Sequence, residues 1–250
     1  MTRLGEPVLR VKKALWRRDD PTAEAGSASA RGPEWESLRK KVLERDDHTC
    51  GHCGFRSEKW QEIHHKDDDH GNSRLENLET LCPWCHGCHH VGLMGVLGKA
   101  RLVWCPEIPQ THLFHLVRTM GVAILQGKSG GGEGAEMGKK ATEAYRTLFQ
   151  LLGNPIRTLW GEDIQNPAML GNLLLAAGER EIKEERLAGF RLLPDLMQWQ
   201  PQVTYWASSV FGATPAGTWR RLAESWKAVA LASDSTLPED EAEVPGGDRG

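Results

Sequence analysis

The chain has 250 residues, of which 26% are charged and 39% hydrophobic, a composition typical of a globular protein with one large or two small domains. The net charge of −3 does not indicate a general nucleic-acid binder, and no run of about 18 apolar residues exists that could span a membrane. Residues 233–250 alone carry six acidic residues and one arginine, so the rest of the chain has a net charge of +2.

The start of the chain bears on the cellular compartment. Residues 1–30 carry charges throughout and lack the apolar segment of a secretory signal peptide. We therefore expect a cytoplasmic protein without membrane insertion. Thiols stay reduced in that compartment, which favours metal binding over disulfide formation for closely spaced cysteines.

The first half of the chain contains short predicted elements of both kinds. Residues 1–33 form an N-terminal segment that ends in a small, polar linker. A helix is predicted over 34–46, because Trp35, Leu38 and Val42 lie on one face at helical spacing. We assign residues 34–126 to one α+β module. Its further predicted elements are a strand over 62–66, a loop over 66–72, a helix carrying His86 to Leu93, a strand over 100–104 and a helix from Gln110 to about Leu125.

The second half is predicted to be helical. Residues 127–138 are rich in glycine and are interpreted as a flexible linker. A mostly helical region follows over 139–232, with apolar residues at helical spacing in 139–152, 167–177 and 215–231. The acidic residues 233–250 are predicted to be a disordered tail.

Four cysteines form two C-x2-C pairs that are separated by 28 residues: Cys50 with Cys53, and Cys82 with Cys85. Such pairs are typical of a tetrahedral zinc site, and four thiolates leave no position for water or substrate, so we expect structural zinc. The second pair precedes a histidine and also fits a haem c attachment sequence or a redox pair. The missing export signal argues against haem, and the first cysteine pair together with the missing βαβ context argues against redox chemistry.

Between and after the cysteine pairs lie the residue types that a metal-dependent phosphodiesterase needs. Such an enzyme requires a base, a cation and a group that holds the base in place. His65 is the candidate base, and Asn77 is expected to hold the loop that carries it. The candidate ligands of a second metal are His64, His86 and His90. Adjacent strand residues point to opposite sides, so His64 and His65 either flank a phosphate at the strand's end or one of them is structural.

This order of motifs resembles the four-cysteine type of HNH endonuclease, which has a ββα-metal fold. By position, the resemblance implies that His65 is the general base and that Asn77 is the middle residue of the motif. His64 and His86 would be metal ligands, whereas His90 matches only some members. The metal would be Mg²⁺, Mn²⁺ or Zn²⁺, and the substrate would be DNA. Zinc-stapled HNH folds also serve as inert scaffolds, so the resemblance leaves activity open.

A longer resemblance covers most of residues 35–210. The segments 42–55, 106–110, 166–168 and 191–194, the last leading to Trp206, are similar in the same order to the IcmJ (DotN) family of type IVB secretion systems. Members of that family are cytoplasmic and join a coupling complex at the inner membrane. They bind the C-terminal part of the coupling ATPase, which implies an HNH-like zinc fold used for docking. The present chain departs from the family pattern by its four histidines at 64, 65, 86 and 90.

Two functions are therefore expected as alternatives. The first is a zinc-binding IcmJ-like component of a type IVB secretion or conjugation coupling complex. The second is an active, metal-dependent HNH DNA endonuclease. The resemblance after Gln110 favours the first, because a minimal nuclease does not need that region, and the intact histidines favour the second. Trp199, Tyr205 and Trp206 are candidate anchors for a docked partner.

Overall fold

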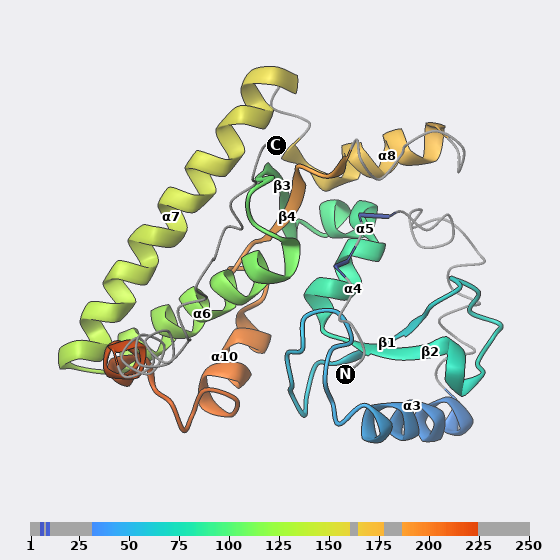
Figure 1. Ribbon diagram of the computed structural model, residues 1–250, viewed down its shortest axis with the longest axis horizontal. Coiled ribbons are helices and arrows are strands. Elements are labelled where there is room, and N and C mark those ends of the chain that lie inside the picture. Colours follow the sequence, from blue (N-terminus) through green and yellow to red (C-terminus); the bar gives the residue numbers. More distant parts are fainter. Residues whose placement is uncertain (1–5, 8, 11–31, 161–164, 178–186, 225–250) are drawn as a thin grey trace, which may run out of the picture.

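The computed structural model describes residues 6, 7, 9, 10, 32–160, 165–177 and 187–224 (Figure 1). It combines helices with two small antiparallel sheets, so the α+β class predicted from the sequence is confirmed. Among the described helices, none combines the length and the apolar character needed to cross a bilayer.

Helix α3 (Pro33–Arg45) confirms the helix predicted over 34–46. Pro33 occupies the first turn, where its missing N–H costs no helical hydrogen bond. Acidic residues in the first turn and Arg45 in the last turn match the helix dipole. The buried face of α3 packs on the first sheet, which runs just above it in Figure 1.

The first sheet is a hairpin. Strand β1 (Glu62–His65) confirms the predicted strand, and it pairs with β2 (Leu78–Leu81) so that His64 lies opposite Glu79. The predicted loop and a short 3-10 helix, η1 (Leu75–Asn77), connect the two strands.

The helix predicted to carry His86 to Leu93 is in fact two helices, α4 (Pro83–His89) and α5 (Val91–Val96). The break lies at His90, whose backbone has φ −128° and ψ 47°. There the Val91 N–H donates to the carbonyl of Arg10, and the Arg10 N–H donates to the carbonyl of Cys88. The N-terminal segment thus supplies backbone partners that a continuous helix would have found within itself.

The described part of the N-terminal segment belongs to the core. Leu9 is buried, and the carboxylate of Glu6 accepts hydrogen bonds from the backbone N–H and the hydroxyl of Thr111. The predicted linker at its end lies outside the described residues, except for Gly32 and Pro33.

The second sheet joins distant parts of the chain. Strand β3 (Ala100–Trp104), which was predicted, pairs with β4 (Phe190–Pro194), which was not. Leu102 lies opposite Leu192 in this pairing, and both side chains are fully buried. The strand from the predicted α+β module is therefore completed by a strand from the predicted helical region.

The glycine-rich segment 127–138, which was predicted to be a flexible linker, is largely helical. Helix α6 (Gln110–Ser129) and helix α7 (Gly132–Trp160) run through it and leave only Gly130 and Gly131 between them. The two helices pack side by side (Figure 1). A Cβ atom on Gly127 would lie 2.7 Å from the Cα of Gly138. The glycines at this crossing therefore permit close contact between helices.

The remaining predicted helices are partly described. Helix α8 (Pro167–Ala177) confirms the pattern in 167–177. Helix α10 (Gln200–Ser208) precedes the 3-10 helix η3 (Ala216–Thr218), and residues 219–224 are helical. Residues 225–231 of the third pattern and the predicted acidic tail lie outside the described residues.

The core changes one expectation about partner binding. Trp199 is 3% exposed and Trp206 is 0% exposed, and both belong to a buried cluster that also contains Trp84. Their rings pack edge-on against Trp84. These two candidate anchors are therefore core residues, and only Tyr205 of the three is partly accessible.

Candidate metal centre and histidine cluster

Four buried cysteines form a compact group. The sulfur atoms of Cys50, Cys53, Cys82 and Cys85 all lie within 4.8 Å of one another, and none is in a disulfide. The Cys53 and Cys82 sulfurs are 3.8 Å apart. Two thiolates bound tetrahedrally at a Zn–S distance of about 2.3 Å would be separated by about 3.8 Å. The group thus has the donors and the spacing to hold a metal ion such as zinc.

Local backbone geometry presents these sulfurs. In the first knuckle the Cys50 N–H donates to the carbonyl of Phe55, and Gly54, with φ 70°, donates back to the carbonyl of Cys50. Glycine accepts this left-handed conformation without strain. The Gly51 N–H also donates to the carbonyl of Thr80, which fixes the knuckle to β2. The sulfurs of the second pair are presented by the first turn of α4. There Cys82 is the N-cap residue, and its sulfur accepts a hydrogen bond from the Cys85 N–H.

The surroundings affect the thiols of the two pairs differently. Hydrogen bonding with Cys50 and the other cluster thiols lowers the pKa of Cys53. Burial raises the pKa of Cys82, since a thiolate is poorly solvated there. A bound cation would favour the thiolate form of all four groups.

A second group of titratable side chains lies next to the metal centre. We call His52, His64, His86, His89 and His90 the histidine cluster. The ring of His64 is 4.1 Å from that of His89 and 5.3 Å from that of His86, measured between centroids. The Nε2 atoms of His86 and His90 are 3.2 Å apart. The structure therefore brings together the three predicted metal ligands.

Three members of this region were missed in the sequence. The Nε2 atom of His52 is 3.1 Å from that of His89, and the carboxylate of Glu62 hydrogen-bonds the Nδ1 atom of His86. Desolvation opposes ionisation of Glu62, but the contact with His86 lowers its pKa overall. Glu62 was detectable in principle, because it precedes His64 by two residues on the same face of β1.

His65 lies on the other face of the strand. Its ring stacks on that of Trp35 at 5.7 Å and on that of His70 at 5.0 Å. It is 7% exposed. The candidate base is thus separated by the strand from the three candidate metal ligands, as the alternation of strand residues requires.

Asn77 organises the loop that follows His65. Its side-chain oxygen accepts from the Asp67 N–H at 3.2 Å, and its amide nitrogen donates to the Asp67 carboxylate at 2.8 Å and to the Asn72 carbonyl at 2.8 Å. The backbone N–H of Asp69, with help from Asn72 and Asn77, lowers the pKa of Asp67 to about 2. These bonds to the ionised Asp67 carboxylate stabilise the loop at pH values above 3.8, the ordinary pKa of that carboxyl group. The stabilisation is lost as the pH falls towards 2.

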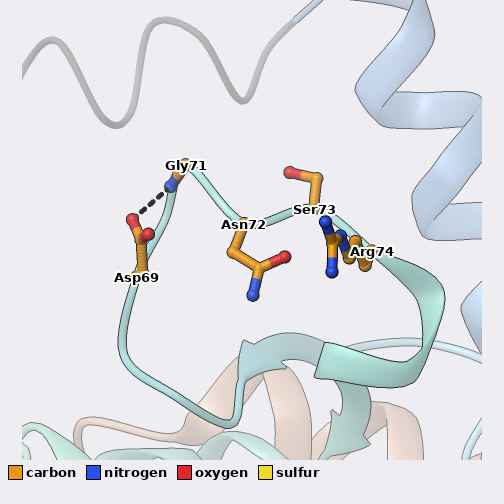
Figure 2. A pocket seen from close by; sticks show the side chains of 5 residues that line it. All are labelled: Asp69, Gly71, Asn72, Ser73 and Arg74. Carbon is orange, nitrogen blue, oxygen red and sulfur yellow. Dashed lines mark hydrogen bonds between the residues drawn. The ribbon is translucent and has the colours of Figure 1, made fainter.

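The same loop forms an open, polar hollow of about 550 Å³, shown in Figure 2. Its lining includes Asn72, Ser73 and Arg74, and the Gly71 N–H donates to the side chain of Asp69. His70, whose ring stacks on that of His65, lies in the sequence between Asp69 and Gly71 of this lining.

We predict that Asn77→Ala lowers the free energy of unfolding by about 1–3 kcal/mol, because it removes the three hydrogen bonds that the buried Asn77 side chain makes to the loop. Denaturant unfolding of the purified protein measures this change. The control is Asn72→Ala, since Asn72 is less buried and its side chain donates only to Asp67. Equal losses in the two variants would contradict the role given to Asn77.

No protein-family model matches the chain. The chain is 32% identical over 181 residues to the type 4 apparatus protein DotN of Legionella pneumophila, and the match covers 70% of this chain and 80% of that protein. A match of this extent includes residues well beyond the two cysteine pairs. The chain therefore belongs to the DotN (IcmJ) family.

Proposed function

We propose that the protein is a zinc-binding component of a type IVB secretion or conjugation coupling complex, located in the cytoplasm at the periphery of the inner-membrane apparatus. The observation that carries this proposal is the match to a type 4 apparatus protein over 70% of the chain, which includes residues outside the metal centre. A shared metal site alone would leave the function open.

In this proposal the zinc ion is structural. It is held by Cys50, Cys53, Cys82 and Cys85, whose four thiolates leave no position for a substrate. Zinc joins the first knuckle, the end of β2 and the start of α4, elements that are individually too short to be stable. The rigid unit is then available for docking.

The proposed partner is the C-terminal segment of a coupling ATPase. We propose that this segment docks on α5 and α8, which pack together at the upper right of Figure 1. Gly95 of α5 lies so close to Ala168 of α8 that a Cβ atom on it would be 2.1 Å from the Ala168 nitrogen. Four large apolar side chains on these helices or at their ends are 40–52% exposed, namely Val96, Leu97, Met169 and Leu173. Exposed apolar groups concentrated in this way are typical of interaction sites.

We predict that Leu173→Asp weakens binding of the ATPase segment by about 30-fold, because an apolar anchor typically contributes about 2 kcal/mol. The measurement is co-purification, followed by titration calorimetry, with the C-terminal segment of the coupling ATPase encoded beside this protein. The control is Leu151→Asp, since Leu151 on α7 is 63% exposed and lies on another helix.

The pattern of results locates the interface. Binding that survives Leu173→Asp but is lost in Trp60→Asp would place the interface on the hairpin side, where Trp60 is 41% exposed. No binding by the unaltered protein would contradict the coupling-complex proposal itself.

The second candidate function is a metal-dependent HNH DNA endonuclease. The proximity of His64, His86 and His90 favours it, since imidazole is a good ligand for zinc and related transition metals. In the part of the chain that the structure describes, however, only the four cysteines bring three or more ligand atoms within 4.8 Å of one another, so a catalytic Mg²⁺, Mn²⁺ or Zn²⁺ would require these rings to move closer together. The order of β1, β2 and α4 supports the nuclease function as well. His65 would be the general base and Asn77 the residue that holds its loop. The burial of His65 between two rings counts against ready access of water and DNA, and we therefore rank this function second.

A further inference from the structure

Arg118 is a charged residue at the centre of the hydrophobic core. It belongs to α6 and is 1% exposed. Its guanidinium carbon lies 3.8 Å from the ring centroid of Phe55, 4.8 Å from that of Trp84 and 5.1 Å from that of Trp206. Cation–π contacts of this kind offset part of the cost of burying a charge. The aromatic rings carry no full negative charge, however, and a buried cation without a negatively charged partner is strongly destabilising.

The anion that faces Arg118 is a cysteine of the metal centre. Among the described residues, no carboxylate lies within 4.0 Å of the guanidinium nitrogens. Instead, a terminal nitrogen of Arg118 donates to the sulfur of Cys82 at 3.5 Å. A thiolate in this place would pair with the guanidinium, whereas a neutral thiol would leave the positive charge without a partner.

His115, one helical turn earlier on α6, contacts the other cysteine pair. Arg118 can only donate, so the Nδ1 atom of His115 accepts from it at 3.4 Å. The Nε2 atom of His115 then carries the proton that it donates to the carbonyl of Cys53 at 2.8 Å. Helix α6 therefore reaches the first knuckle through His115 and the second through Arg118.

We propose that Arg118 is the charge-compensating residue of the metal centre, and that Arg118 and His115 make α6 part of that centre by holding both cysteine pairs. The inference rests on the proposed zinc site. A divalent cation with four thiolates leaves two negative charges in a buried place, and a fixed guanidinium lowers the cost of keeping them there. The metal centre and the packing of α6 against the core are then mutually dependent.

The test compares zinc affinity in two variants of α6. Arg118→Met keeps the apolar stem and removes the charge, and we expect it to weaken zinc binding about 10- to 100-fold, the range for outer partners of metal ligands. Affinity is measured by competition with a chromophoric chelator on the full chain. Cobalt substitution adds a second measurement, because the sulfur-to-metal charge-transfer bands should shift when the hydrogen bond to Cys82 is lost. The matched control is Val117→Ala, which removes fully buried methyl groups from the neighbouring position and changes no charge and no hydrogen-bonding group.

The outcomes separate this inference from the proposed function. Wild-type protein without bound zinc overturns the proposed site and the inference with it. Tight zinc in the wild type and unchanged affinity in Arg118→Met overturn the inference alone, as does an equal loss in Val117→Ala at matched stability. If Arg118→Met does not fold, affinity is measured on His115→Ala, where about 10-fold weaker binding is expected. Wild-type affinity in that variant overturns the proposal.

Discussion

We expect Cys82→Ser to lose the bound zinc and to unfold the region around the hairpin and α4. Zinc binding contributes on the order of 10–16 kcal/mol in small zinc modules, which is comparable to the entire stability of a typical domain. Cys82 also caps α4 and contacts both Cys53 and Arg118, so its loss leaves several groups without partners. Metal analysis should give one zinc per chain in the wild type and none in the variant. Circular dichroism and tryptophan fluorescence should report the unfolding.

The matched control is Cys105→Ser. Cys105 is equally buried but lies outside the four-cysteine group, at the end of β3. This control should keep its zinc and unfold cooperatively. Chelator treatment of the wild type should reproduce the Cys82→Ser result, because both remove the same ion. Well-folded wild-type protein that contains no metal would contradict the structural zinc site.

The second large effect concerns the nuclease alternative. If the protein nicks plasmid DNA with Mg²⁺, Mn²⁺ or Zn²⁺, His65→Ala should reduce the rate by about 10²–10⁴-fold, the usual contribution of a general base. The structural zinc should remain, since His65 lies on the opposite face of β1 from the histidine cluster. His112→Ala is the control, because His112 is exposed on α6 and away from the hairpin.

Two results would decide between the functions. Equal nicking by wild type and His65→Ala would assign the activity to a contaminant or to another base. Absence of nicking by the wild type with all three metals, together with binding of the ATPase segment, would leave the coupling component as the function. In that case the histidine cluster contributes to packing beside the metal centre.

The sequence alone determined the features that depend on local spacing. Each C-x2-C pair is presented by one turn of chain, so its two sulfurs converge whatever the rest of the protein does. The elements α3, β1 and β3 were likewise detectable in the sequence, because each is indicated by the residue pattern of one short, continuous segment. The alternation along β1 also indicated that His64 and His65 face opposite sides, and the structure agrees.

Only the tertiary structure decided how distant segments combine. Strand β4 exists because its apolar residues pair with β3 almost 90 residues earlier, and no local signal specifies that partner. Gly127 and Gly138 favour flexibility when considered alone, yet they permit close helix contact once α6 and α7 are packed. The same holds for Arg118. Its charge alone favours a position at the surface, but three aromatic rings and a cysteine sulfur surround it in the fold. The charge of a metal centre is balanced by groups close in space, and sequence separation places no limit on which groups those are.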